Sequence, residues 1–233
     1  MNKDRFISEV ESLGIEITDN KLEQLEKYYE LLIEYNKVMN LTGITEKEDV
    51  YLKHFYDSLT ITKIIDLNKE NSLCDLGSGA GFPGIVIKIF YPNLNIILVD
   101  SLNKRINFLN TVIRELGLEN IEAIHSRIED YSKENKEQFD VVTARAVAPL
   151  NILLELGINL VNVGKYFIAM KGNIENEPDY NNAIKKLNCR LGNIIKFKLP
   201  IEESNRSLIK IIKEKSTSKL FPRKYSEVKK RPL

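Results

Sequence analysis

The chain of 233 residues is poor in the side chains that build disulfide frameworks and metal clusters. Its two cysteines, Cys74 and Cys189, stand 115 residues apart, without a Cys-x-x-Cys pair or a neighbouring histidine cluster. This spacing excludes a disulfide-rich scaffold and provides no zinc motif, so we expect no metal site. Cys74 lies inside an apolar run, where a cysteine is more often a core residue than a nucleophile.

Long apolar runs and a strong net charge are also missing. The run IVIKIF (85–90) is interrupted by Lys88, and the first residues, MNKDRFISEVE, are charged, so neither a membrane span nor a signal peptide is indicated. The formal net charge is +1, which gives no sign of a nucleic-acid partner for the chain as a whole. With 43% hydrophobic residues the chain can bury a substantial core. We expect a cytoplasmic monomer with no membrane partner.

Charge is unevenly distributed along the chain. Residues 1–70 carry 9 Lys/Arg and 15 Asp/Glu, whereas residues 219–231 carry six basic side chains and a single acid, Glu227. A basic tail of this kind is either a local anchor for phosphates or a solvated, frayed terminus. The basic residues in question are Lys219, Arg223, Lys224, Lys229, Lys230 and Arg231.

Helical spacing dominates the first 70 residues. Apolar residues recur at intervals of three and four over 3–13 and 19–40, with Asp19 or Asn20 as a cap for the second helix. A third helix is expected over about 46–59, capped by Thr45. Residues 1–70 are therefore predicted to form an N-terminal helical extension.

The pattern changes at Ser72, where short apolar strands begin to alternate with helices. Alternation of this kind predicts βαβ units and a mostly parallel sheet with helices on both faces, an α/β Rossmann-like fold over residues 71–233. The last two strands have no helix between them, which predicts an antiparallel hairpin at one end of the sheet. The expected strands are 72–77, 96–100, 121–126, 139–147, 165–172, 193–200 and 207–214, and the expected helices begin at 85 or cover 103–116, 151–161 and 178–187.

The strongest local signal is a glycine turn, GSGAGFPG (77–84), between a strand and a helix. Glycine allows a positive φ and lets a ligand approach the backbone without a Cβ in the way. Four glycines within eight residues at this place predict a ligand-binding turn.

Two ligands compete for this turn. Gly79, Gly81 and Gly84 match the dinucleotide pattern G-x-G-x-x-G, and Asp100 follows at nearly the spacing of the acid that binds the ribose. Against NAD, Asp75 at the strand end would repel a pyrophosphate but attract a sulfonium or ammonium ion. The dinucleotide pattern should also start directly at the strand end, where Gly77 and Ser78 intervene here. A cationic cofactor is preferred, and an NAD-dependent oxidoreductase is the alternative.

Three further side chains follow strands at the same edge of the predicted sheet, where ligands of open α/β sheets bind. Asp100 would accept the hydroxyls of an adenosine ribose, or else cap the following helix. Glu129, next to Ile128, would accept from the adenine amine, or else be an exposed loop acid. Arg145 stands among apolar neighbours, which favours a pairing or a ligand contact because an isolated buried charge is costly.

Several segments of the chain together resemble the RsmG/GidB family of methyltransferases. They are YNKVMNLT (35–42), HFYDSL (54–59), DLGSGAGFPG (75–84), LVDSLNKRINFL (98–109), FDVVTARAVA (139–148), KG (171–172) and FPRK (221–224). The resemblance implies a class I, Rossmann-like enzyme that uses S-adenosylmethionine to methylate N7 of guanine 527 in 16S rRNA. The partner would be the small ribosomal subunit or its assembly intermediate. A non-catalytic RNA-binding protein on the same fold remains a further alternative.

The resemblance also implies site residues. Cofactor contacts fall on Gly77, Phe82, Ile128, Glu129 and Arg145, within the turn that contains Gly79, and Asp100 matches the acid of the broader methyltransferase class. Guanine N7 already bears a lone pair, so no general base is required, and we predict no catalytic residue. Arg223 and Lys224 are candidate rRNA contacts. After FPRK the family often has an ending that contains Gly and Pro, whereas this chain reads YSEVKKRPL, so the tail contact departs from the family pattern.

Overall fold

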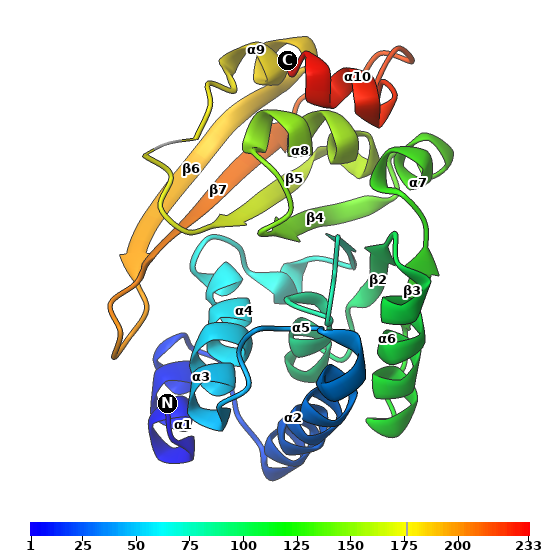
Figure 1. Cartoon of the computed structure of the whole chain (residues 1–233). Helices are drawn as coiled ribbons and strands as arrows, with labels where there is room; N and C mark the ends of the chain where they lie inside the picture. The colour runs from blue at the N-terminus through cyan, green and yellow to red at the C-terminus, as the bar shows by residue number, and fades with distance from the viewer. Residues whose placement is uncertain (176) are drawn as a thin grey trace.

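The computed structural model describes residues 1–175 and 177–233, and a seven-stranded sheet forms its centre (Figure 1). The strand order is β3-β2-β1-β4-β5-β7-β6. Strands β1 to β5 pair in parallel, and β7 is antiparallel to both β5 and β6. The predicted α/β class and the terminal antiparallel hairpin are confirmed. The strands are β1 Ser72–Leu76, β2 Asn95–Asp100, β3 Ile121–His125, β4 Phe139–Arg145, β5 Val161–Lys171, β6 Cys189–Lys198 and β7 Asn205–Lys213.

Helices cover both faces of the sheet, as predicted, with the N-terminal helices on one face and the C-terminal helices on the other (Figure 1). The first face carries α1 Lys3–Ser12, α2 Asp19–Met39, α3 Lys47–Val50, α4 Asp57–Leu59, α5 Gly84–Phe90 and α6 Asn103–Glu115. The second carries α7 Ile128–Glu134, α8 Leu150–Gly157, α9 Asn181–Lys186 and α10 Tyr225–Lys230. Short helical turns complete the chain: η1 Tyr51–Tyr56, η2 Thr60–Lys63, η3 Leu67–Lys69 and η4 Ile158–Leu160.

The central strands show why the sheet needs a helical layer on each side. All but the last residue of β4 are buried, and its neighbouring valines, Val141 and Val142, point into two different apolar clusters. Successive side chains of a strand point to opposite faces, so a strand that is apolar at consecutive positions must be covered twice.

The N-terminal helices pack directly on the sheet. Tyr28 of α2 and Phe55 are fully buried, and they belong to one apolar cluster with Ile85 of α5 and Leu98 of β2. Residues 1–70 therefore share a core with the sheet, and a domain boundary at residue 70 stays a prediction. The helix predicted over 46–59 is continuous through α3, η1 and α4, but its centre, η1, is a π-helical turn.

Two predicted caps and several element ends differ from the structure. Thr18, not Asp19 or Asn20, caps α2 by accepting from the amide of Lys21 at 3.4 Å. Glu46 rather than Thr45 precedes α3, and its side chain makes no capping bond. Helices α7 and α10 were not predicted, and β5 and β6 each begin four residues earlier than expected.

Candidate functional site

The glycine turn connects β1 to α5 and uses the conformations that only glycine adopts easily. Gly77, Gly79 and Gly81 have φ values of +68°, +60° and +99°. A Cβ on Gly77 would lie 2.7 Å from Cγ2 of Val147, so a larger residue would not fit there. A Cβ on Gly79 would meet nothing closer than the carbonyl oxygen of Gly77 at 3.8 Å, because this glycine borders an open cavity.

Asp75 lies beneath the turn rather than in the cavity. Its side chain is fully buried, and its Oδ2 accepts from the amide of Gly84 at 3.0 Å. Burial raises the pKa of Asp75 to about 7. Asp75 is absent from the described residues that line the cavities at the turn. Asp75 can therefore act on a ligand only through its charge and not by direct contact, and its predicted effect on the choice of ligand stays a prediction.

Two cavities meet at Gly77 on the carboxyl edge of the parallel strands. The carboxylate cavity, of about 380 Å³, is lined by Gly77, Asp100, Ser101, Arg105, Ser126, Arg127, Ile128, Glu129, Ala146, Val147, Ala148, Leu156 and Tyr225. The arginine cavity, of about 470 Å³, also includes Gly77, Arg105 and Ala146. Its other walls come from the turn, the N-terminal segment and the ends of β4, β5 and β7, through Gly79, Phe82, Thr42, His54, Asp57, Arg145, Lys171 and Arg206.

Asp100, at the end of β2, forms the junction between the turn and the next helix. Its Oδ2 accepts from the amide of Gly79 at 2.9 Å and from Nη1 of Arg105 at 3.2 Å. Its Oδ1 accepts from the amide of Leu102 at 2.9 Å, just before α6 begins. This bond closes a turn ahead of α6 and is not a helix cap, because Leu102 is itself the N-cap residue of α6 and no side chain caps that helix. The carboxylate also lines the carboxylate cavity, where the predicted ribose contact stays a prediction.

Glu129 accepts fewer hydrogen bonds than Asp100 among the described residues. It lies in the first turn of α7, not in a loop, and its side chain is 10% exposed. Its nearest basic group is Arg127 Nη1 at 3.9 Å, and it accepts no hydrogen bond from residues 1–175 or 177–233. Its carboxylate oxygens are not among the buried unpaired atoms of the described residues, so they remain open to the cavity. This acid is therefore available to a donor placed in the carboxylate cavity.

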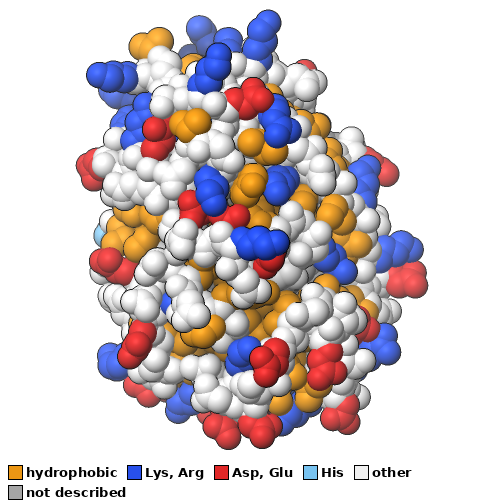
Figure 2. Space-filling view, turned by 180° about the vertical axis from the view of Figure 1, so that it is seen from behind, with side chains coloured by type: hydrophobic (Ala, Val, Ile, Leu, Met, Phe, Trp, Pro, Cys, Tyr) orange, Lys and Arg blue, Asp and Glu red, His pale blue; other side chains and the backbone are white. Residues whose placement is uncertain are grey.

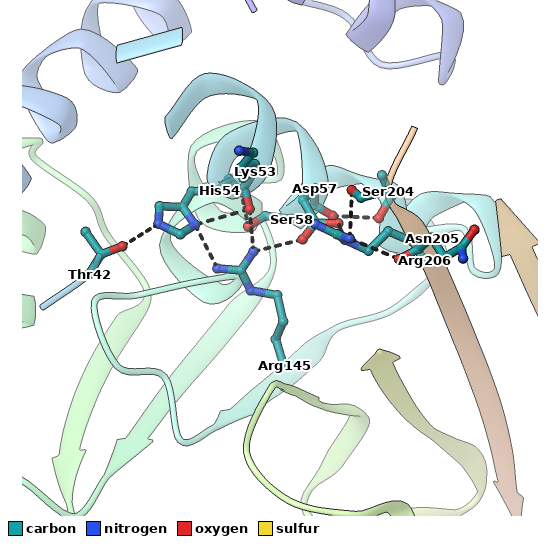
Figure 3. A network of polar contacts seen from close by, with 10 residues as sticks. Thr42, Lys53, His54, Asp57, Ser58, Arg145, Ser204, Asn205 and Arg206 are labelled. Carbon is teal, nitrogen blue, oxygen red and sulfur yellow. Dashed lines mark hydrogen bonds and ion pairs between the residues drawn. The ribbon is translucent and has the colours of Figure 1, made fainter. Parts of the chain in front are cut away.

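Arg145, at the end of β4, is held by a network that spans the chain (Figure 3). Its Nη1 donates to Asp57 Oδ2 at 3.0 Å and to the carbonyl of Lys53 at 2.9 Å. Arg206 Nε donates to the other oxygen of Asp57 at 2.9 Å. Lys53 belongs to the π-helical turn, where the wider backbone spacing commonly marks functional sites. Asp57 thus holds two arginines at the wall of one cavity.

His54 and Phe82 form the aromatic side of the arginine cavity. Their rings stack with centroids 4.4 Å apart, and Cζ of Arg145 lies 5.3 Å from the centroid of the Phe82 ring. His54 Nε2 is 2.8 Å from the hydroxyl of Thr42. Burial, together with the charge of Arg145, lowers the pKa of His54 to about 3, so the imidazole is neutral near pH 7.

The structure brings most of the predicted site residues together. Gly77, Gly79, Phe82, Asp100, Ile128, Glu129 and Arg145 all line one or both cavities. Sequence reasoning missed Asp57, Arg206 and Tyr225. The sequence offered a signal for Asp57, which is the lone acid in the stretch HFYDSL. It offered none for Arg206, which stands just before the strand expected over 207–214.

The basic tail is neither frayed nor wholly free for a partner. Arg223 Nε and Nη2 donate to Glu155 of α8 at 2.7 and 2.6 Å, and the Glu155 side chain is fully buried. Arg223 is thus held in an internal ion pair while its side chain stays 26% exposed, and its predicted contact with rRNA phosphate stays a prediction. Lys224 is exposed, as expected for a surface contact. Val228 of α10 is fully buried against α8, so the segment is docked.

Searches for a metal cluster and a membrane span found neither in the part of the chain that the structure describes. Within residues 1–175 and 177–233 no group of three or more His, Cys, Asp or Glu side chains could hold a metal ion. None of the helices described there is long and apolar enough to cross a bilayer.

Comparison with known sequences gives a full-length match. The profile of the GidB family, described as rRNA small subunit methyltransferase G, matches residues 21–208. "Ribosomal RNA small subunit methyltransferase G" of Bacillus licheniformis is 48% identical over 237 aligned residues, covering 100% of this chain and 99% of that protein. The protein of the same name from Exiguobacterium sibiricum is 45% identical, and the alignment covers 100% of both.

Solved structures show the same fold at low identity. A SAM-dependent methyltransferase from Aquifex aeolicus aligns with a TM-score of 0.53 and 16% identity, over 74% of this chain and 97% of that one. A mutant of the 16S rRNA (adenine(1408)-N(1))-methyltransferase from Catenulisporales acidiphilia aligns with a TM-score of 0.52 and 13% identity, over 62% and 86%. These likenesses support the Rossmann-like class I methyltransferase fold.

Proposed function

The chain belongs to the GidB family of rRNA small subunit methyltransferase G, and from that premise we propose that it transfers the methyl group of S-adenosylmethionine to N7 of a guanine in 16S rRNA. The observation that carries the proposal is the pair of cavities that meet at Gly77. One offers acids and apolar side chains to an adenosine, and the other offers arginines and aromatic rings to a base. Guanine 527 is the position that the family resemblance implies.

The carboxylate cavity fits the adenosine of the cofactor. Glu129 has a carboxylate without a hydrogen-bond donor from the described residues, and the exocyclic amine of adenine is such a donor. Asp100, Ser101 and Ser126 add polar groups suited to ribose hydroxyls, and Ile128, Ala148 and Leu156 add apolar wall. Apolar walls with a few convergent polar groups are typical of small-molecule sites.

The arginine cavity fits the methionine end of the cofactor and the acceptor base. It begins at Gly77 and Gly79, where the backbone permits close approach. Arg145 and Arg206 present guanidinium groups, which suit carboxylate, phosphate and the O6 and N7 edge of guanine. Phe82 and the neutral His54 also line this cavity, but their rings are buried and stack on each other, so they present only a small aromatic surface to a base.

The bound cofactor supplies an electrophilic methyl group on a sulfonium. This methyl group would pass to N7, whose lone pair can accept it directly. No proton has to leave, so the task of this chain is alignment. The glycine turn fixes the position of the donor. The Asp57–Arg145–Arg206 network fixes the wall against which the acceptor is held.

The surface charge supports an RNA partner. In Figure 2 several Lys and Arg side chains lie at the top of the view, at the end where Figure 1 places α9 and α10, while others are spread over the rest of this face and many Asp and Glu side chains lie at the bottom. The exposed basic residues of the tail are Lys219, Lys224, Lys229, Lys230 and Arg231. We expect them to contact rRNA phosphates. Replacing them by glutamine should lower the salt dependence of RNA binding by about one log unit per lost contact.

The test of the proposed function is transfer of a labelled methyl group from S-adenosylmethionine to small-subunit RNA, mapped by chain cleavage specific for N7-methylguanine. Label at a single guanine of 16S rRNA supports the proposal, and binding of RNA without transfer supports a non-catalytic binding protein. Calorimetric titration with NADH against S-adenosylhomocysteine decides the cofactor. Binding of NADH with no binding of S-adenosylhomocysteine would overturn the proposal in favour of an oxidoreductase.

A further inference from the structure

We propose that the C-terminal segment 221–233 is part of the cofactor site, and that the ring of Tyr225 forms a wall of the carboxylate cavity against the adenine. The inference rests on the proposed function, because it takes the occupant of this cavity to be the adenosine of S-adenosylmethionine. It assigns a binding role to a residue that follows FPRK, in the stretch where the chain departs from the Gly- and Pro-containing ending of its family.

Tyr225 is the first residue of α10 and lines the same cavity as Asp100 and Glu129. Its residue surface is 38% exposed, whereas Tyr28, a core tyrosine, has no exposed surface. A tyrosine offers a large flat apolar face at little cost in side-chain entropy, and aromatic rings stack on bases of every kind. A ring left open at the edge of a purine-sized cavity is therefore placed to contact the base.

The helix that carries Tyr225 is built into the wall of the cavity. Val228 forms an apolar cluster with Ile152 and Leu156 of α8, and Ile128 and Ala148 pack against this cluster. Of these residues, Leu156, Ile128 and Ala148 themselves line the carboxylate cavity. Movement of α10 would therefore disturb three cavity residues as well as Tyr225.

Two polar contacts fix the segment just before Tyr225. Arg223 donates to both oxygens of the buried Glu155, and Nδ2 of Asn159 donates to the carbonyl of Phe221 at 2.7 Å. Both partners lie on or just after α8. A bidentate ion pair fixes orientation as well as distance. The ring of Tyr225, two residues after Arg223, is therefore positioned before any ligand arrives.

Different residues of the carboxylate cavity suit different parts of adenosine. Glu129 and Asp100 supply acceptors for the amine and hydroxyl edges. Ile128, Leu156 and Tyr225 supply apolar surface for the faces of the ring system. The segment thus serves cofactor binding, whereas its exposed lysines, such as Lys229 and Lys230, serve the RNA.

The experiment compares Tyr225→Ala, Tyr225→Phe and the parent by calorimetry with two probes, S-adenosylhomocysteine and 5′-methylthioadenosine. We expect Tyr225→Ala to raise the dissociation constant of both probes at least about fivefold, because both carry the same adenosine. Tyr225→Phe keeps the ring and should bind within about twofold of the parent. Ser226→Ala, an exposed substitution on the same helix, is the matched control and should leave both constants unchanged.

The outcomes separate this inference from the proposed function. A parent protein that binds neither probe overturns both. A parent that binds them, with Tyr225→Ala equally tight, overturns the role of Tyr225 alone. Loss confined to S-adenosylhomocysteine would place the effect at the amino-acid end and also overturn it. Because Tyr225 is partly exposed, we expect thermal unfolding to show that Tyr225→Ala is folded. The affinity of Tyr225→Leu for the same two probes then distinguishes the contribution of the aromatic ring from that of apolar volume.

Discussion

Replacing Glu129 by alanine should weaken cofactor binding while leaving the protein as stable as before. The reason is the unusual isolation of this carboxylate, which is 10% exposed and accepts no hydrogen bond from residues 1–175 or 177–233. Among the described residues its removal breaks no side-chain hydrogen bond, and the ion pair that it loses is the 3.9 Å approach of Arg127. What it removes is an acceptor aimed at the carboxylate cavity.

The magnitude follows from the kind of bond that is lost. A hydrogen bond to a charged acceptor contributes about 1.5–3 kcal/mol, so the dissociation constant of S-adenosylhomocysteine should rise about 10- to 100-fold. The effect on stability should be small. An acid in the first turn of α7 favours the helix by about 0.3–1 kcal/mol.

Asp130 provides the matched control for this experiment. It stands next to Glu129 in the same helical turn, but it is exposed. Asp130→Ala should therefore reproduce the small helix effect without changing cofactor affinity, and Glu129→Gln should lie between parent and Glu129→Ala. The assays are calorimetric titration for affinity and urea unfolding for stability. Parent-like affinity in Glu129→Ala, or a loss of more than about 2 kcal/mol of stability, would refute the reasoning.

Three shorter predictions test the turn, the acid beneath it and the anchor of the tail. Gly79→Val should abolish S-adenosylhomocysteine binding in a folded protein, because its side chain would enter the arginine cavity from a φ of +60°; retained affinity would remove the turn from the site. Because burial raises the pKa of Asp75 from 3.8 to about 7, the native protein keeps a proton that the unfolded chain releases, so the free energy of unfolding should fall as pH rises from about 4 to about 7. Asp75→Asn should lose this slope relative to the parent in urea titrations at several pH values, a comparison that cancels the opposite slope from His54. Glu155→Ala should cost about 3 kcal/mol and speed tryptic cleavage after Arg223 and Lys224, and an unchanged cleavage rate would show that the ion pair does not hold the segment.

The parts of the site that could be predicted from the sequence are those whose signals are local. Four glycines between a strand and a helix require a turn, and acids that directly follow strands must reach the carboxyl edge of a parallel sheet. Gly77, Asp100 and Glu129 were found in this way. Asp75 shows the limit of the method, since the residue was identified but the direction of its side chain, inward beneath the turn, depends on packing.

The parts that escaped prediction depend on contacts across the chain. Nothing near Arg206 in the sequence indicates that it shares Asp57 with Arg145, because that contact exists only once the sheet order is known. Helix α10 was missed because YSEVKK is short and polar, and its single buried anchor, Val228, leaves no periodic pattern. Neither alternative for the basic tail, a phosphate anchor or a solvated terminus, included the internal ion pair that Arg223 makes with Glu155.

The sharing of Asp57 has a consequence for the order of events during synthesis. Asp57 precedes Arg145 by 88 residues and Arg206 by 149. At about 5–20 residues per second, the ribosome needs roughly 7–30 s to deliver the second arginine after the carboxylate has been made. The N-terminal helices therefore emerge with an acid whose two arginine partners have not yet been made. A chain stalled before β7 contains the glycine turn but lacks Arg206, which lines the arginine cavity. This cavity is therefore complete only after the hairpin of β6 and β7 has been synthesised.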